Sequence, residues 1–148
     1  MGYRKTTVIL GIFSCWLNLV AQSIERTTVE ANLVTEVTLT SVNRYANPFT
    51  EIELNAVVTQ PDGNKLRIPM FWVGNNQWSL RYASNTLGEH TYETECSDSI
   101  NKGLHRQKGS ITVETYKGNN SLYQHGPIRI ANDKRHFEHQ DGTPFLWL

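Results

Sequence analysis

The sequence predicts an all-β protein built as an antiparallel β-sandwich, and three observations predict it. From Val29 onward, apolar residues recur at every second position, which is the spacing of half-buried strands rather than of helices. Turn signals such as Gln60-Pro61-Asp62-Gly63 separate these runs, because proline presets φ and glycine accepts a positive φ. The 148 residues, 39% of them hydrophobic, suffice for one core of ordinary size.

Six short strands are predicted. In chain order they occupy residues 33–39, 51–58, 65–72, 77–82, 89–96 and 110–115. Apolar and polar residues alternate in each run, as where Leu54 and Ala56 flank Asn55. Pro69 interrupts the third run, which predicts an edge strand or a bulge there. Short strands, frequent turns and the lack of a convincing helical stretch favour an immunoglobulin-like sandwich over residues 28–121.

The C-terminal segment, residues 122–148, has a different pattern. A compact hairpin is predicted around Ile128 to His139, and an apolar run that does not alternate follows it. Such a run is typical of a strand buried on both faces, as in a parallel barrel. Exposing its side chains would forfeit roughly 1.5–3 kcal/mol each. The residues expected to dock against a barrel are Phe145, Leu146, Trp147 and Leu148. We therefore expect the chain to be the front of a longer protein.

The N-terminus, residues 1–21, is predicted to be a secretory signal peptide. Arg4 and Lys5 precede an apolar run, and the small residue Ala21 follows it. The run is too short to cross a bilayer, which takes about 20 apolar residues, so no stable membrane insertion is expected after cleavage. We expect a secreted or periplasmic protein. An uncleaved anchor and a lipoprotein signal acylated at Cys15 remain alternatives.

The composition argues against several classes of function. Because 14 Lys and Arg balance 14 Asp and Glu, no basic stripe is available to bind nucleic acid. The two cysteines form no CxxC motif and no Cys/His cluster, which argues against a zinc module. Neither a Gly-x-Ser-x-Gly elbow nor a glycine-rich phosphate loop occurs. No cofactor and no metal are expected.

Two groups of polar residues invite a catalytic or metal-binding interpretation. Glu93 and Glu95 lie on one strand face roughly 7 Å apart, a separation that superficially fits glycoside hydrolysis. However, they belong to an ordinary solvated face, so no catalytic residue is expected. His136 and His139 are three positions apart on a predicted strand, so they point to opposite faces and cannot share a metal ion unaided.

Aromatic residues provide the remaining candidates for binding. Flat rings can stack on sugars, which makes Trp72, Trp78 and Tyr82 candidate carbohydrate-binding residues. The alternation also places these three with the apolar face, which favours core packing. Tyr92, four residues after Gly88, is a candidate for a hydroxyl that pins a corner of the sandwich, with a ligand contact as its alternative.

Several motifs carry a resemblance to a known family. In chain order they are Asn47-Pro48-Phe49, Phe71-Trp72, Trp78-Ser79-Leu80-Arg81-Tyr82 and Leu87-Gly88-Glu89-His90-Thr91-Tyr92. The chain resembles the N-terminal immunoglobulin-like domain of unknown function that precedes an apiosidase-like (β/α)8 catalytic barrel in secreted bacterial glycoside hydrolases. The tail, His125 to Ile130 and Asp141 to Leu148, looks like the hairpin and first barrel strand that open the catalytic domain.

The resemblance implies a non-catalytic accessory domain that packs against and orients a downstream glycoside hydrolase barrel absent from this chain. The catalytic carboxylates of such a parent lie far downstream, so this chain is expected not to be an enzyme. The main alternative is a carbohydrate-binding module that grips polysaccharide through exposed aromatic residues. A third hypothesis is a gene fragment with no independent role. The family's usual aspartate is missing from Phe71-Trp72-Val73-Gly74, which argues against a ligand role for that turn.

Overall fold

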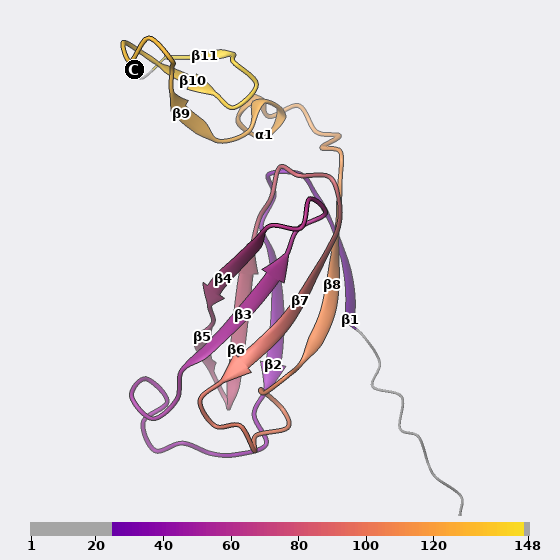
Figure 1. Ribbon diagram of the computed structural model, residues 1–148, viewed down its shortest axis with the longest axis vertical. Coiled ribbons are helices and arrows are strands. Elements are labelled where there is room, and N and C mark those ends of the chain that lie inside the picture. The colour runs from indigo at the N-terminus through magenta and orange to yellow at the C-terminus, as the bar shows by residue number, and fades with distance from the viewer. Residues whose placement is uncertain (1–24, 147–148) are drawn as a thin grey trace, which may run out of the picture.

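The structure is a computed structural model that describes residues 25–146. The predicted signal peptide and the residues Trp147 and Leu148 lie outside the described residues. The elements in chain order are β1 (Glu25–Glu30), β2 (Thr35–Thr40), β3 (Leu54–Thr59), β4 (Lys65–Pro69), β5 (Phe71–Gly74), β6 (Gln77–Tyr82), β7 (Gly88–Cys96), β8 (Lys108–Glu114), α1 (Ser121–His125), β9 (Ile128–Ile130), β10 (Phe137–His139) and β11 (Pro144–Phe145). Figure 1 shows an elongated sandwich with a smaller unit beyond one end.

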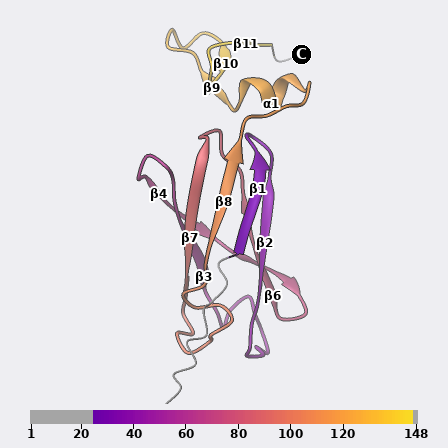
Figure 2. The same ribbon diagram turned by 90° about the vertical axis from the view of Figure 1, so that its right-hand side faces the viewer.

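The strands β1 to β8 form two layers (Figure 2). One sheet has the order β1-β8-β7-β3-β4, and the other has the order β2-β6-β5. The predicted all-β sandwich is therefore confirmed. Every strand pair within it is antiparallel except β1 and β8, which run parallel over six residue pairs from Glu25↔Gly109 to Glu30↔Glu114. Alternation along one strand carries no information about its partner, so the sequence could not predict this exception.

The core lies between the two sheets, and the strands supply it by alternation. In β7, the side chains of His90, Tyr92, Thr94 and Cys96 are buried, whereas Glu89, Thr91 and Glu95 face solvent. Cys96 has a pKa raised by burial, as expected of a small core residue. The largest fully buried apolar side chains are Leu80, Leu104, Ile111, Val37 and Val58.

Tyr92 lies across the neighbouring strand rather than at a corner. It pairs with Gly109 of β8, and a Cβ at position 109 would overlap the phenol ring. Burial raises the pKa of Tyr92 to about 12, with a smaller contribution from the charge of Glu25. Gly109 therefore provides the space that this ring occupies.

The chain crosses from one sheet to the other at Pro69. The single predicted strand over 65–72 is two strands, because β4 pairs with β3 and β5 pairs with β6. β4 is an edge strand, and the register of β5 shifts between Trp72 and Gly74, so the prediction drawn from Pro69 is confirmed. Proline cannot donate a ladder hydrogen bond, which favours a strand end at this position.

Asn101, in the loop after β7, is fully buried and connects two loops at one end of the sandwich. Its amide Nδ2 donates to Ser41 Oγ and to the Tyr45 hydroxyl, both at 2.7 Å. Its Oδ1 accepts from the backbone amides of Val42 at 3.3 Å and Gly103 at 3.1 Å. These bonds join the loop after β2 to the loop after β7.

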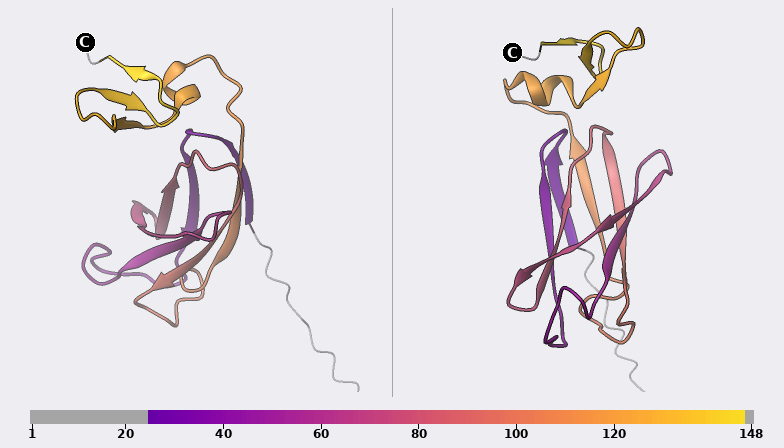
Figure 3. Two further views of the ribbon diagram at one scale, coloured as in Figure 1. Left: turned by 45° about the horizontal axis from the view of Figure 1, so that its top comes forward. Right: turned by 90° about the vertical axis from the view of Figure 1, so that its left-hand side faces the viewer.

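The C-terminal unit consists of α1 and the sheet β11-β10-β9, and it lies over one end of the sandwich in all views (Figure 3). The helix differs from the prediction, which contained none. Asn120 caps it, its Oδ1 accepting a hydrogen bond from the Leu122 amide at 3.0 Å. A helix of five residues is too short to produce a recognisable 3.6-residue pattern.

Candidate docking and binding surfaces

A junction of three contacts holds the C-terminal unit against the sandwich. Asn32, in the turn after β1, donates from Nδ2 to the carbonyl oxygen of Tyr123 at 2.7 Å. The rings of Tyr116 and Tyr123 meet edge to face with centroids 5.6 Å apart. The Glu30 carboxylate accepts from the Lys117 amide at 3.2 Å. Both sides of the connecting segment are thus attached, which gives the unit a defined orientation.

The strands β9, β10 and β11 separate charged from apolar side chains. On one face, Arg129 and Glu138 form an ion pair of 2.9 Å. The opposite face carries Ile128, Ile130 and Phe137, because Phe137 pairs directly with Ile130. These three side chains are 43%, 63% and 46% exposed. His139 shares this face but is buried beside the His125 ring, so the exposed part of the face centres on Ile130 and Phe137.

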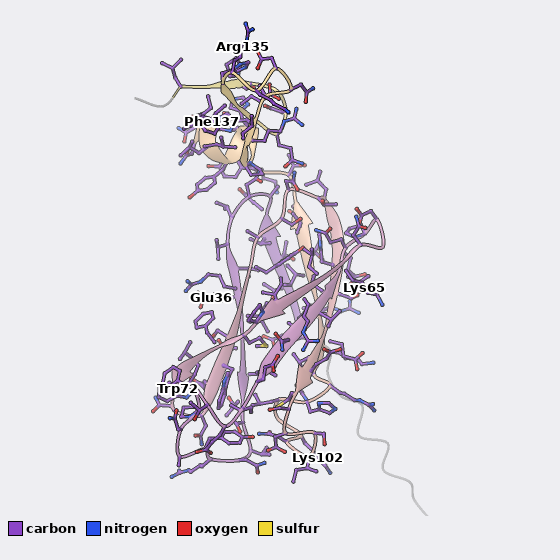
Figure 4. The ribbon with its side chains drawn as sticks, turned by 60° about the vertical axis from the view of Figure 1, so that its left-hand side comes forward. Glu36, Lys65, Trp72, Lys102, Arg135 and Phe137 are labelled. Atoms are coloured by element: carbon purple, nitrogen blue, oxygen red, sulfur yellow. The ribbon has the colours of Figure 1, made fainter. Side chains whose placement is uncertain are left out.

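Of the residues expected to dock against a barrel, Phe145 and Leu146 are described, at the end of the same sheet. Phe145 pairs with Phe137 and is half-buried, its ring lying edge-on to His139 with centroids 5.4 Å apart. Leu146 is 74% exposed. Figure 4 shows Phe137 within the C-terminal unit and Trp72 near the opposite end of the molecule. The apolar face and the candidate Trp72 are therefore separate surfaces.

A cleft of about 490 Å³ separates this unit from the end of the sandwich. The sandwich contributes the turn after β1, the start of the β3–β4 turn and the loop after β6, and the C-terminal unit contributes α1, β9 and β10. The lining residues are Asn32, Gln60, Ala83, Ser84, Asn85, Leu122, Tyr123, Gly126, Pro127, Ile128 and His139. None of them is Asp, Glu, Lys or Arg.

Two of the three candidate carbohydrate-binding residues lie in the core. Trp78 and Tyr82 are each 3% exposed, so neither can offer a ring face to a sugar. Trp78 packs edge-on against Tyr45, and the Tyr82 hydroxyl is 2.9 Å from Nδ1 of the buried His90. Trp72 is half-buried, and Phe49 packs edge-on against it with centroids 5.3 Å apart. Only Trp72 of the three reaches solvent.

The structure gives the paired carboxylates no catalytic environment. Glu93 lies 3.3 Å from Lys108, and Glu95 lies 3.0 Å from Arg67. All four side chains are about half exposed or more, as expected for a solvated sheet face. A general acid for glycoside hydrolysis requires a site shielded from water, and this open sheet face does not provide one.

A second group, His125, Asp141 and Thr143, resembles a catalytic triad but lacks its geometry. His125 Nδ1 is 2.7 Å from Asp141 Oδ2 and 3.2 Å from the Thr143 hydroxyl. A proton relay needs one partner on each ring nitrogen, whereas both contacts here are made to the same nitrogen. Hydrogen bonds from the Thr143 amide and from His125 lower the pKa of Asp141 to about 2. No local sequence signal indicated this cluster.

The histidines considered as metal ligands have other partners. His136 lies 3.3 Å from Asp133, and His139 Nδ1 is 2.8 Å from the Gly126 carbonyl oxygen. Over residues 25–146, no group of three or more His, Cys, Asp or Glu side chains is placed to hold a metal ion. None of the described helices has the length and apolar character needed to cross a membrane.

Comparisons with known proteins identified a matching family model and similar solved structures. A model of a domain of unknown function, DUF5060, matches residues 28–97. The chain is similar in structure to a putative glycoside hydrolase from Bacteroides vulgatus ATCC 8482, with a TM-score of 0.66 and 26% identity. The match covers 80% of this chain and 21% of that protein. A filamin domain of Lin-41 matches with a TM-score of 0.42 and 17% identity, over 66% of this chain and 90% of that domain. No curated protein sequence matches the chain.

The match to the Bacteroides protein includes more than the sandwich. Coverage of 80% corresponds to about 118 of the 148 residues, which exceeds the 116 residues up to Tyr116. The similarity therefore extends beyond Tyr116. The chain spans about one fifth of the length of that protein.

Proposed function

We propose that this chain is a non-catalytic accessory β-sandwich of a secreted glycoside hydrolase, and that it packs against and orients a catalytic barrel that follows it. The exposed side chains of Ile130 and Phe137 on the apolar face carry the proposal, since they are 63% and 46% exposed on a small, ordered sheet. Because each is already about half buried, covering the rest of it stabilises a contact by roughly 1 kcal/mol. Contiguous exposed apolar surface is typical of an interaction site.

The comparison with the Bacteroides protein supports an accessory role. This chain corresponds to about one fifth of a protein described as a glycoside hydrolase, and the match covers 80% of this chain. In our proposal the remaining four fifths contain the catalytic carboxylates. Phe145 and Leu146, at the end of the apolar sheet, would then be the first residues to contact the barrel.

The junction supports the orienting part of the role. A flexible linker would let two domains rotate freely, whereas Asn32, Tyr116 and Glu30 fix the connection to the C-terminal unit. A barrel that packs on the apolar face would therefore be held at a constant angle to the sandwich. Polysaccharide binding through Trp72, Trp78 and Tyr82 has less support, because two of these three rings are in the core.

The first test reads the genomic sequence beyond the codon for Leu148. We expect an open reading frame that continues into a (β/α)8 barrel. A stop codon directly after this position would contradict the proposal, because no barrel would then follow in the same polypeptide.

The second test measures docking in that longer product. Ile130→Ser and Phe137→Ser should each weaken the contact, so that the sandwich and the barrel unfold in two separate thermal transitions rather than one. The matched control is Arg135→Ser, in the turn between β9 and β10, which lies in the same unit but off the apolar face (Figure 4). Unfolding of both serine variants in the same single transition as the unmodified protein would overturn the docking surface.

We also propose that residues 1–21 direct export. Expression in a bacterial host with N-terminal sequencing of the extracellular or periplasmic product tests this, and the expected first residue is Gln22. A product retained in the cytoplasm with its full N-terminus would contradict it. A mature product that begins at an acylated Cys15 would instead support the lipoprotein alternative.

A further inference from the structure

The cleft between the sandwich and the C-terminal unit has the chemistry of a ligand site. Its volume of about 490 Å³ lies within the range of small-molecule pockets, about 300–1,000 Å³. Because its lining contains no Asp, Glu, Lys or Arg, a charged ligand would lose hydration without gaining an ionic partner. A purely apolar ligand would strip water from the amides of Asn32 and Asn85. The lining therefore favours a neutral, polar ligand.

Several hydrogen-bonding groups in the cleft are available to such a ligand. The Nδ2 of Asn32 is held by the Tyr123 carbonyl, and its Oδ1 remains as an acceptor. Ser84 Oγ accepts from the Thr86 amide, which leaves its hydroxyl proton to donate. The side-chain amide of Asn85 forms no hydrogen bond with any described residue. Donors and acceptors therefore occur together.

His139 adds an acceptor that is fixed in place. The residue is 5% exposed, and its Nδ1 lies 2.8 Å from the Gly126 carbonyl oxygen. A carbonyl oxygen can only accept, so Nδ1 carries the proton and the neutral ring has its lone pair on Nε2. No described residue is recorded as bonded to Nε2, while His139 forms part of the cleft wall.

An apolar wall faces these polar groups. The Tyr123 ring is 38% exposed and is held edge-on by Tyr116, and Ile128 lies beside it in the lining. A sugar ring presents hydroxyl groups at its edge and C–H groups on its face, so it suits a site with amides on one side and a fixed aromatic ring on the other. We propose that this cleft binds a neutral saccharide of one or two units.

The test titrates the 148-residue chain, labelled with 15N, with cellobiose, xylobiose and maltose in turn. We expect at least one of them to give saturable shifts of the Asn85 side-chain amide and the Tyr123 backbone amide. The charged disaccharide digalacturonate should shift neither signal. The absence of saturable shifts at these residues with all three neutral disaccharides would overturn the proposal, as would equal binding of digalacturonate.

Variants locate the binding. Asn85→Ala should raise the dissociation constant at least fivefold, about the effect of one hydrogen bond. Tyr123→Leu, which keeps apolar bulk but removes the flat ring, should raise it about tenfold. Asn119→Ala, an exposed asparagine outside the cleft, is the control and should change nothing. Unchanged binding in both cleft variants would place the saccharide elsewhere and overturn the proposal. Because this titration needs no barrel, its failure leaves the docking proposal standing, and the reverse also holds.

Discussion

At the scale of single residues, buried polar side chains contribute most to what the sequence leaves unpredicted. Asn101 lies within a polar stretch, residues 97–108, that reads as an ordinary surface loop, yet it is fully buried. His90, in contrast, occupies an inward position of the alternating strand β7 and is fully buried; its Nε2 lies 2.8 Å from the Thr86 carbonyl oxygen. Alternation identifies which strand positions face inward, but it cannot predict which loop residue forms a network.

Replacing Asn101 with alanine should destabilise the sandwich by about 3 kcal/mol. The change leaves the Val42 and Gly103 amides without their side-chain partner, and each unsatisfied group costs about 1–3 kcal/mol before relaxation. Chemical denaturation measures the free energy of unfolding. The control Asn119→Ala, at an exposed position, should stay within about 0.5 kcal/mol. A loss below 1 kcal/mol for Asn101→Ala would show that the network contributes little.

At the scale of elements, most strands of the sandwich were predictable because one face is exposed to solvent and the other is buried, so polar and apolar residues alternate along the strand. The predicted runs over 77–82 and 89–96 correspond closely to β6 and β7. The third predicted run failed as a single strand, because a proline at an inter-sheet crossing leaves the alternation intact. The helix α1 was missed because five residues are too few to establish a 3.6-residue pattern, and β1 was missed because Val29 is the only apolar residue within it.

The turn between β10 and β11 should depend on pH through Asp141. Its pKa of about 2 lies below the value of about 3.9 expected in an unfolded chain. A depressed pKa stabilises the folded turn above pH 4, and this contribution is lost as the pH falls from about 4 to 2. The Thr143 amide, which donates to Asp141 at 2.9 Å, should report the titration by NMR.

Its resonance should shift with a midpoint near pH 2, and Asp141→Asn should abolish the shift. A midpoint near pH 4 would show that the Thr143 and His125 hydrogen bonds do not persist in solution. Asp62, whose carboxylate accepts from the Asn64 amide in the turn after β3, provides a comparison site in the same sample.

At the scale of the whole molecule, the orientation of the C-terminal unit was not predictable. The sequence indicated a sandwich and a hairpin, but the contacts between them join residues as distant as Asn32 and Tyr123. The cleft arises from the same arrangement and so has no signature in any single segment. Alternation favoured a core position for the candidates Trp72, Trp78 and Tyr82, but it could not show how far each ring is buried.

Removing the Asn32 side chain should loosen this arrangement. Asn32 adopts a positive φ of 66°, which glycine tolerates without strain, so Asn32→Gly removes the bond to Tyr123 and leaves the turn intact. In 15N relaxation, amides of β9 and β10 should then tumble faster than those of β7. The control Asn75→Gly, at a positive φ of 49° in the distant turn after β5, should leave both parts tumbling together. Uniform tumbling in Asn32→Gly would show that the other contacts suffice.

The parallel pairing of β1 with β8 also determines how the sandwich responds to stretching. β1 is the first described strand, and β8 leads directly to the C-terminal unit. Tension applied at Glu25 and at Glu114 pulls the two strands in opposite directions along their length, so the hydrogen bonds of all six residue pairs carry the load at the same time. An antiparallel pair pulled from adjacent ends would open one bond after another. The β1–β8 pairing therefore resists a stretching force that is applied between the segment before β1 and the segment after β8.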